Sequence, residues 1–211
     1  YTTKKVEVDV EELSHLVPFI TECYHGGRNE QYWFGPGVED NWIDIDLASA
    51  YPTAMSLIGL PDWHQLRESK SIKDFTPTTL GFLWVDFQFP NSVRYPTLPV
   101  RSSNGLVFPL QGTSYCAAPE LCAAIELGCK IKIRKGVIIP TNPEIRIFGE
   151  FISKCIQKRQ ASGSKTLEGL FWKEISNSTY GKTAQGLRKR RVYDMRDRET
   201  KPLPPSRITN P

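Results

Sequence analysis

The chain has 211 residues, of which 39% are apolar and 24% are charged, and its formal net charge is +4 at neutral pH. This apolar content is ample for a hydrophobic core, and the length allows one large domain or two small ones. No apolar run approaches the roughly 20 residues that a membrane-spanning helix needs, and no charged-then-apolar leader marks a secreted protein. We therefore expect a cytoplasmic protein, in a host cell or an organelle matrix, with no membrane partner.

The charge is distributed unevenly along the chain. Residues 1–50 carry 3 basic and 10 acidic side chains (−7), residues 51–150 carry 10 and 8 (+2), and residues 151–211 carry 14 and 5 (+9). A basic last third fits a phosphate-rich partner. Charge alone fits a solvated basic surface equally well.

The five cysteines are an odd number without the spacing of a metal site. There is no Cys-x-x-Cys and no pair of histidines, so we expect no zinc site. They are interpreted as small apolar core residues in a reducing compartment. These residues are Cys23, Cys116, Cys122, Cys129 and Cys155.

In chain order, residues 4–10 alternate in the manner of a short strand, and 11–23 have helical spacing that Pro18 limits. Gly26 and Gly27 follow. Two adjacent glycines allow a close backbone approach, or form an ordinary turn.

The segment 42–46 (WIDID) reads as a buried strand that runs through a tight turn into a short helix at 54–60. Asp44 and Asp46 share one face of such a strand. A carboxylate at the end of a buried strand needs a neutralising partner, and a divalent cation is one. Periodicity does not decide which of the two binds it.

Residues 62–79 read as a loop, and 83–89 as a half-buried strand. Two short strands at 95–101 and 106–110 are joined by a hairpin signal. A helix is predicted at 115–127, with Pro119 and Glu120 in its first turn, followed by a strand at 130–134 that continues to 139.

Asn142-Pro-Glu144 has the composition of a helix start. A turn at 162–165 leads to a second helix at about 166–179, so the two helices form an antiparallel hairpin. The first helix carries an apolar stripe: Ile147, Phe148, Phe151, Ile152, Cys155 and Ile156. On the second, one face is predicted to pack: Leu167, Phe171, Ile175 and Ser178. The opposite face is predicted to carry function: Lys173, Asn177 and Tyr180. After the second helix, residues 191–207 read as a loop or a short hairpin.

Three motifs resemble blocks of the family B DNA polymerases, and they occur in the family's order. Residues 46–52 (DLASAYP) resemble motif A, and residues 173–181 (KEISNSTYG) resemble motif B. Residues 24–27 (YHGG) resemble the motif that joins the exonuclease and polymerase regions in the protein-primed branch, found in phages, viruses and linear plasmids. The family's third block, Tyr-x-Asp-Thr-Asp, does not occur in the chain. We therefore expect a fragment of a polymerase.

This resemblance implies a nucleotide and metal site. Asp46 would bind Mg²⁺ (or Mn²⁺) with the carbonyl of Leu47 as a further ligand, and Asp46 and Lys173 would be the catalytic residues. Tyr51 would be the steric gate under the incoming sugar. The other nucleotide-binding residues would be Lys173, Asn177, Tyr180 and Arg159, although Lys158 is an alternative to Arg159 and a solvated face fits both. Asp46 could instead cap the turn, and Tyr51 or Tyr180 could be packing residues.

The resemblance also implies contacts with DNA. The residues concerned are Tyr24, Gly26, Gly27, Ser49, Gly181, Arg188, Lys189, Arg190 and Arg191. The implied partners are a DNA primer-template, a deoxynucleoside triphosphate and a terminal priming protein. No role is assigned to His25.

The predicted fold class is α+β, an incomplete right-hand polymerase palm on a mostly antiparallel sheet with a two-helix fingers hairpin. Residues 1–30 would be an entry segment, 31–141 the palm, 142–181 the fingers and 182–211 a basic return segment. The expected function is template-directed DNA synthesis by two-metal nucleotidyl transfer to a primer 3′-hydroxyl, with the fragment alone inactive. The alternative is a DNA- or nucleotide-binding module without activity of its own.

Overall fold

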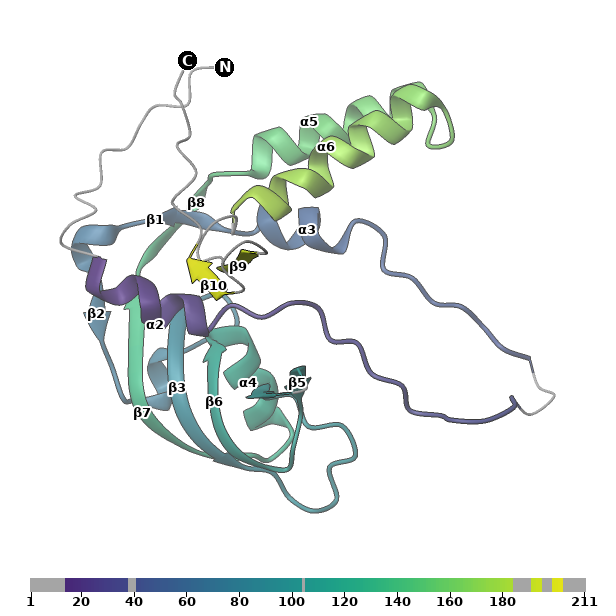
Figure 1. Ribbon diagram of the computed structural model, residues 1–211. Helices are drawn as coiled ribbons and strands as arrows, with labels where there is room; N and C mark the ends of the chain where they lie inside the picture. The colour runs from purple at the N-terminus through teal and green to yellow at the C-terminus, as the bar shows by residue number, and fades with distance from the viewer. Residues whose placement is uncertain (1–13, 38–40, 104, 184–190, 195–198, 203–211) are drawn as a thin grey trace.

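The computed structural model describes residues 14–37, 41–103, 105–183, 191–194 and 199–202. Its centre is a four-stranded antiparallel sheet in the order β2-β7-β3-β6. The strands are β2 (Arg67–Glu68), β3 (Leu80–Gln88), β6 (Gln111–Ala117) and β7 (Lys130–Ile139). The mixed α and β architecture with antiparallel sheets confirms the predicted α+β class (Figure 1).

One face of this sheet packs on helix α4 (Ala118–Glu126) to form the hydrophobic core. Residues of β3 alternate between buried and half-buried, as the period of two in the sequence predicts. Leu83 is fully buried and faces Cys116 across the β3–β6 pair. The predicted helix at 115–127 starts later than expected, because residues 115–117 complete β6. The carboxylate of Glu120 accepts the amide of Ala117 at 2.7 Å, which caps the helix.

Helix α2 (Val17–Glu22) follows the 3-10 turn η1 (Ser14–Leu16) and crosses one end of the opposite sheet face (Figure 1). Pro18 lies in its first turn and starts the helix rather than limiting it. The Phe19 ring packs edge-on against Tyr115, and the Cys23 thiol donates to the Leu83 carbonyl. Four of the five cysteines are buried, which confirms their interpretation as core residues.

A second, two-stranded sheet pairs β1 (Gly59–Pro61) with β8 (Thr141–Arg146). The helix start predicted at Asn142 is therefore wrong, and the helix predicted at 54–60 ends at Ser56, before β1. A Cβ on Gly59 would lie 2.6 Å from the Asn142 carbonyl oxygen, so this pairing requires glycine. The Asn142 side chain still accepts the Glu144 amide, but it does so inside a strand. Pairing between distant segments overrode the local capping signal.

Smaller elements complete the first part of the chain. Residues 62–79 form mostly loop, as predicted, with short turns η2 (Trp63–Gln65) and η3 (Ile72–Asp74). The predicted hairpin is present but shorter, as β4 (Val100–Ser102) and β5 (Gly105–Val107). The predicted hairpin near the end of the chain pairs β9 (Arg191–Asp194) with β10 (Glu199–Pro202). The strand predicted at 4–10 lies outside the described residues.

Helices α5 (Gly149–Ser162) and α6 (Leu167–Thr183) form the predicted antiparallel hairpin, which projects from the sheets (Figure 1). On α5, Ile152 and Cys155 are buried, whereas Phe151 and Ile156 are exposed, and Ile147 of the predicted stripe lies before the helix and is also exposed. The predicted packing face of α6 is wrong. Leu167 and Phe171 are 86% and 58% exposed, and the buried residues are Gly169 and Ser176.

Small residues set the contact face of α6 because the turn folds back closely on the helix. A Cβ on Gly169 would lie 2.0 Å from the Gly163 carbonyl oxygen. A larger side chain would therefore push the turn and the helix apart.

Residues 24–37 and 41–49 lie along a long extension from the body, here called the arm (Figure 1). Its described residues 26–37 and 41–48 are all exposed, including Trp42 and Ile45. The strand predicted at 42–46 is wrong: the segment has no regular secondary structure. A strand needs a neighbour for its backbone hydrogen bonds, and none of the described segments pairs with it. The following helix α3 (Ala50–Ser56) begins four residues before the predicted start.

Candidate functional site

Tyrosines from all three sequence motifs meet where α3 lies against α5 and α6. The ring of Tyr51, on α3, stacks on the ring of Tyr180, on α6, with centroids 4.3 Å apart and planes at 23°. Tyr180 also shares a side-chain hydrogen bond with Tyr24. We call these three residues the tyrosine cluster.

The turn before α3 directs Tyr51 towards this cluster. Ser49 adopts a left-handed backbone conformation (φ 55°, ψ 37°), and it is the one non-glycine residue with positive φ in the described part of the chain. Its carbonyl accepts the Thr53 amide at 2.9 Å, so the helix begins immediately after the turn. Such backbone conformations are costly and concentrate at functional sites.

The loop at residues 24–27 is held against the sheet by two contacts that the sequence analysis missed. The His25 Nε2 donates to the Tyr115 carbonyl at 2.6 Å, and Arg101 donates to the Tyr24 carbonyl at 2.7 Å. Each joins residues more than 70 positions apart, so no local pattern could reveal them.

Gly27 brings this loop against the cluster. A Cβ there would contact the Tyr51 hydroxyl at 3.4 Å, whereas Gly26 has open space around it.

Packing in the cluster changes the acidity of Tyr180. Burial, the hydrogen bond with Tyr24 and the nearby Tyr24 and Tyr51 phenols together raise the pKa of Tyr180 to about 12. Desolvation disfavours the phenolate, and the donated hydrogen bond stabilises the neutral form. Tyr180 therefore presents a neutral aromatic ring at physiological pH, suited to packing against a base or a sugar.

The other predicted residues of the helical hairpin lie at varied depths. Lys173 is exposed, Asn177 is half-buried one turn further along α6, and Gly181 is exposed with open space at its Cβ position. Arg159, on α5, is half-buried, and its Nε is buried without a hydrogen-bond partner among the described residues. Lys158 is exposed.

Asp46 and Leu47 lie in the exposed arm just before the Ser49 turn, and not at the end of a strand. Both residues are described, and no hydrogen bond or ion pair joins Asp46 to Lys173. A carboxylate and a backbone carbonyl suit Mg²⁺, which binds one or two protein carboxylates and keeps several waters. These two donors therefore fit part of a magnesium site. No group of three or more His, Cys, Asp or Glu side chains suited to a metal occurs in the described part of the chain.

Comparison with known proteins assigns the chain to a family. Residues 13–208 match the model of the family described as "DNA polymerase type B, organellar and viral". The chain belongs to this family. The predicted resemblance to family B DNA polymerases is therefore confirmed.

Two curated relatives and one solved structure are similar to this family B chain. It is 43% identical to the primer-independent DNA polymerase PolB of Escherichia coli, over all of the chain and 25% of the relative. It is 30% identical to the DNA-directed DNA polymerase of Enterobacteria phage PRD1, over 77% of the chain and 28% of that protein. The chain thus spans about a quarter of the length of these relatives.

A crystal structure of Phi29 DNA polymerase, in an orthorhombic form, has a similar fold. The TM-score is 0.50, with 17% identity over 72% of the chain and 30% of that structure.

Some family B motif residues lie beyond what the structure describes. Arg188, Lys189 and Arg190 are outside the described residues, and Arg191 is described only as the first residue of β9. Among the helices of the described ranges, none combines the length and the apolar character needed to cross a membrane.

Proposed function

We propose that this chain is part of a longer DNA polymerase that copies a DNA template with deoxynucleoside triphosphates. The observation that carries the proposal is the tyrosine cluster, because it joins residues from three separate motifs in one site. Both curated relatives are named DNA polymerases, and the chain covers only about a quarter of each. In this proposal residues 1–30 form an entry segment, 31–141 the palm, 142–181 the fingers and 182–211 the return towards the palm.

Asp46 and the Leu47 carbonyl would hold a divalent cation, Mg²⁺ or Mn²⁺, in this proposal. When bound, the metal would neutralise charge on the phosphates and on the primer 3′-oxygen. Exposure of the arm at Asp46 leaves its carboxylate accessible to a triphosphate. The role of this chain is to place that carboxylate immediately before the rigid turn at Ser49.

The incoming nucleotide would lie beside the tyrosine cluster. Tyr51, half exposed, would pack beneath the sugar and exclude a 2′-hydroxyl, while Tyr180 and Asn177 would shape the base pocket. Lys173 would bind the triphosphate, as its exposed ammonium is a mobile point charge. Arg159 is the second cation proposed for the triphosphate, since its buried Nε has no partner among the described residues.

DNA would be bound by the surrounding motif residues. These are Tyr24, Gly26, Gly27, Ser49, Gly181, Arg188, Lys189, Arg190 and Arg191. The E. coli relative is named a primer-independent polymerase. A terminal priming protein is the further partner that we propose, and it rests on the resemblance of residues 24–27 to the motif of the protein-primed branch and not on that name.

The test is primer extension by the complete polymerase with and without Mg²⁺, using Asp46→Asn and Asp44→Asn as a matched pair. Loss of a metal ligand removes several kcal/mol of charge stabilisation, so Asp46→Asn should lower kcat by about a thousandfold. Asp44→Asn, on the same segment, should keep most of the activity. Equal losses in both variants would contradict the metal assignment, and an inactive wild-type protein would favour the binding-module alternative.

A further inference from the structure

The sheet face opposite α4 is covered only at one end. Helix α2 crosses that end (Figure 1), and no described helix covers the rest. Beyond α2, strands β7, β3 and β6 present polar side chains in three columns, and the cross-strand register places them opposite one another. We call this the open sheet face, and its residues are Lys130, Lys132, Arg134, Asp86, Gln88 and Gln111.

Charge on this face is not balanced. Arg134 and Asp86 form an ion pair at 2.8 Å, and the Thr113 hydroxyl also donates to this carboxylate, so these two charges offset each other. Lys130 and Lys132 are exposed, and neither forms an ion pair within the described residues, although Lys132 lies opposite Asp86 and its charge helps to lower the pKa of that carboxyl. They lie on the same face of β7, about 6.7 Å apart along the strand. Two unpaired cations in a row favour a partner with regularly spaced negative charges.

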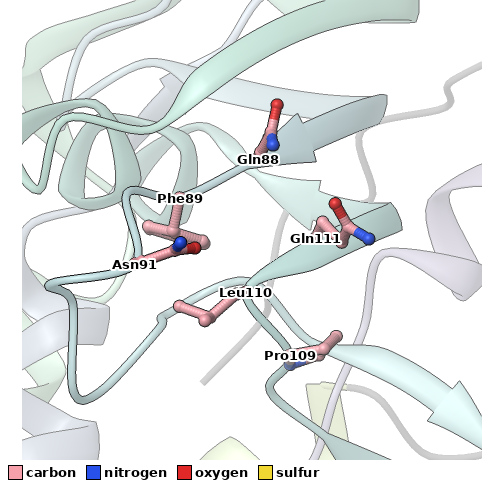
Figure 2. Close-up of a pocket in the computed structure, with 6 residues that line it drawn as sticks. All are labelled: Gln88, Phe89, Asn91, Pro109, Leu110 and Gln111. Atoms are coloured by element: carbon pink, nitrogen blue, oxygen red, sulfur yellow. The ribbon is translucent and has the colours of Figure 1, made fainter.

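Beside the lysines, the ends of β3 and β6 line an open pocket of about 260 Å³, whose other lining residues include the apolar Phe89, Pro109 and Leu110 (Figure 2). Gln88 faces Lys130 across one pair of strands and Gln111 across the other. Figure 2 shows Gln88 and Gln111 projecting from neighbouring strand ends, with Asn91 close by at the loop. Carboxamides carry both donors and acceptors and can therefore pair with the polar edges of nucleobases.

We propose that the open sheet face binds a single strand of nucleic acid, with phosphates along Lys130 and Lys132 and bases over Gln88 and Gln111. From β7 to β6 is two strand spacings, about 9.6 Å, comparable with the reach of a nucleotide from phosphate to base edge. This inference rests on the proposed polymerase function, because the strand would be DNA that the enzyme handles outside its nucleotide site.

The face is connected to the candidate site along one strand. Gln111 lies four residues before Tyr115 on β6, about 13 Å away, and the Tyr115 carbonyl anchors the loop of Tyr24 through His25. Lysines also protect exposed strands from pairing with other chains. Such protection explains the charge on β7, but it does not explain the carboxamides of Gln88, Asn91 and Gln111 at the pocket beside it.

The first test compares two double variants of the complete polymerase, Lys130→Gln with Lys132→Gln, and Lys70→Gln with Lys73→Gln. The second pair removes the same charge from exposed loop positions near η3, beside the core residue Phe75. The measurement is the affinity for a single-stranded oligothymidylate across a salt series. Loss of two phosphate contacts should reduce the slope of log affinity against log salt by about 1.4, and weaken binding about tenfold at low salt. The control pair should match the wild type.

The second test maps contacts directly. A single-stranded oligonucleotide carrying photoreactive thymidine should cross-link to peptides containing Gln88 or Gln111, and the Gln88→Ala, Gln111→Ala variant should reduce the yield at least threefold. The inference would be overturned if the salt slopes were unchanged and no cross-link formed on these strands. The lysines of β7 would then serve only to keep that strand from pairing with other chains. Primer extension by the wild type, measured in parallel, shows separately whether the proposed function holds.

Discussion

The central sheet and the arm contain similarly apolar segments that reach opposite environments. Leu83 on β3 is fully buried between neighbouring strands and α4, whereas Ile45 on the arm is 88% exposed. The sheet obtains its hydrogen bonds and its apolar contacts from this chain. The arm contacts the body near its start, where the Arg28 guanidinium donates to the Pro96 carbonyl and Tyr32 packs edge-on against Tyr95. Its residues 41–48, which include Asp46, are exposed and have no regular secondary structure.

This difference separates stability from function within the chain. The buried residues that make the sheet a rigid support have no proposed chemical role, whereas the residues proposed for the nucleotide and metal site lie on the arm, on α3, on α6 and, for Arg159, on α5. Binding groups are commonly carried by exposed segments on a rigid scaffold. Opening free energies are lowest where apolar contacts are few, so the arm should open far more readily than the sheet.

The largest expected effect on stability tests this separation directly. Leu83→Ala should lower the free energy of unfolding by about 2–5 kcal/mol, because it leaves a cavity in the packed core. Ile45→Ala should change it by less than about 0.5 kcal/mol, as exposed substitutions do. Urea titration of the chain, followed by tryptophan fluorescence, measures both. Similar losses for the two variants would show that the arm packs as well as the sheet.

Sequence reasoning succeeded where the structure depends on local pattern. The alternation along β3 and the Pro-Glu start of α4 come from neighbouring residues, and both were predicted. It failed where the secondary structure of a segment depends on partners that are distant in the sequence. The 42–46 segment has strand composition but no described partner, and Asn142 pairs with β1 instead of starting a helix.

The candidate site shows the same division. Motif resemblance gave the identities of Tyr24, Tyr51 and Tyr180, but not their mutual contacts. The face of α6 that carries Lys173, Asn177 and Tyr180 was predicted to lie opposite the packing face. In the structure the buried residues of α6 are the small Gly169 and Ser176, and the predicted packing residues Leu167 and Phe171 are exposed.

The next prediction concerns an exposed residue whose loss should lower activity and not the stability of the fold. Lys173→Ala in the complete polymerase should lower kcat/KM for the nucleotide by about 30- to 1000-fold, the effect of removing a preorganised electrostatic group worth about 2–4 kcal/mol. DNA affinity should change little. Lys165→Ala, in the turn of the same hairpin, should leave both quantities near the wild-type values. Steady-state kinetics and DNA binding distinguish the outcomes, and a loss mainly in DNA affinity would assign Lys173 to DNA instead.

Neutralising Arg188 to Arg191 should have the opposite effect, with weaker DNA binding and a flatter salt dependence, because each phosphate contact releases counterions. A loss confined to nucleotide kcat/KM would contradict this contrast with Lys173.

A smaller effect is expected from the aromatic ring on α3. Tyr51→Val should raise ribonucleotide incorporation relative to deoxyribonucleotide incorporation, by about a hundredfold at most, since a pocket that rejects one hydroxyl by shape has limited discrimination. Tyr51→Phe keeps the ring and should keep the discrimination. The ratio of kcat/KM for the two nucleotides is the measurement. If valine leaves this ratio unchanged, Tyr51 is a packing residue of the cluster.

The smallest expected effect is a change in the pKa of Tyr180. This change tests whether the 24–27 loop and α6 are energetically coupled. Because the pKa of Tyr180 is raised to about 12, its neutral form stabilises the fold below pH 10, and this contribution is lost as the pH rises from about 10 through 12. Tyr24→Phe removes the hydrogen bond but keeps most of the burial. The pKa of Tyr180 should therefore fall towards 10 without reaching it, and the pH window should narrow. Ultraviolet titration of tyrosinate absorbance measures this, with Tyr180→Phe identifying the late-titrating group. An unchanged late titration in Tyr24→Phe would mean that burial alone sets the acidity of Tyr180, and that the loop makes no energetic contact with α6 through this pair.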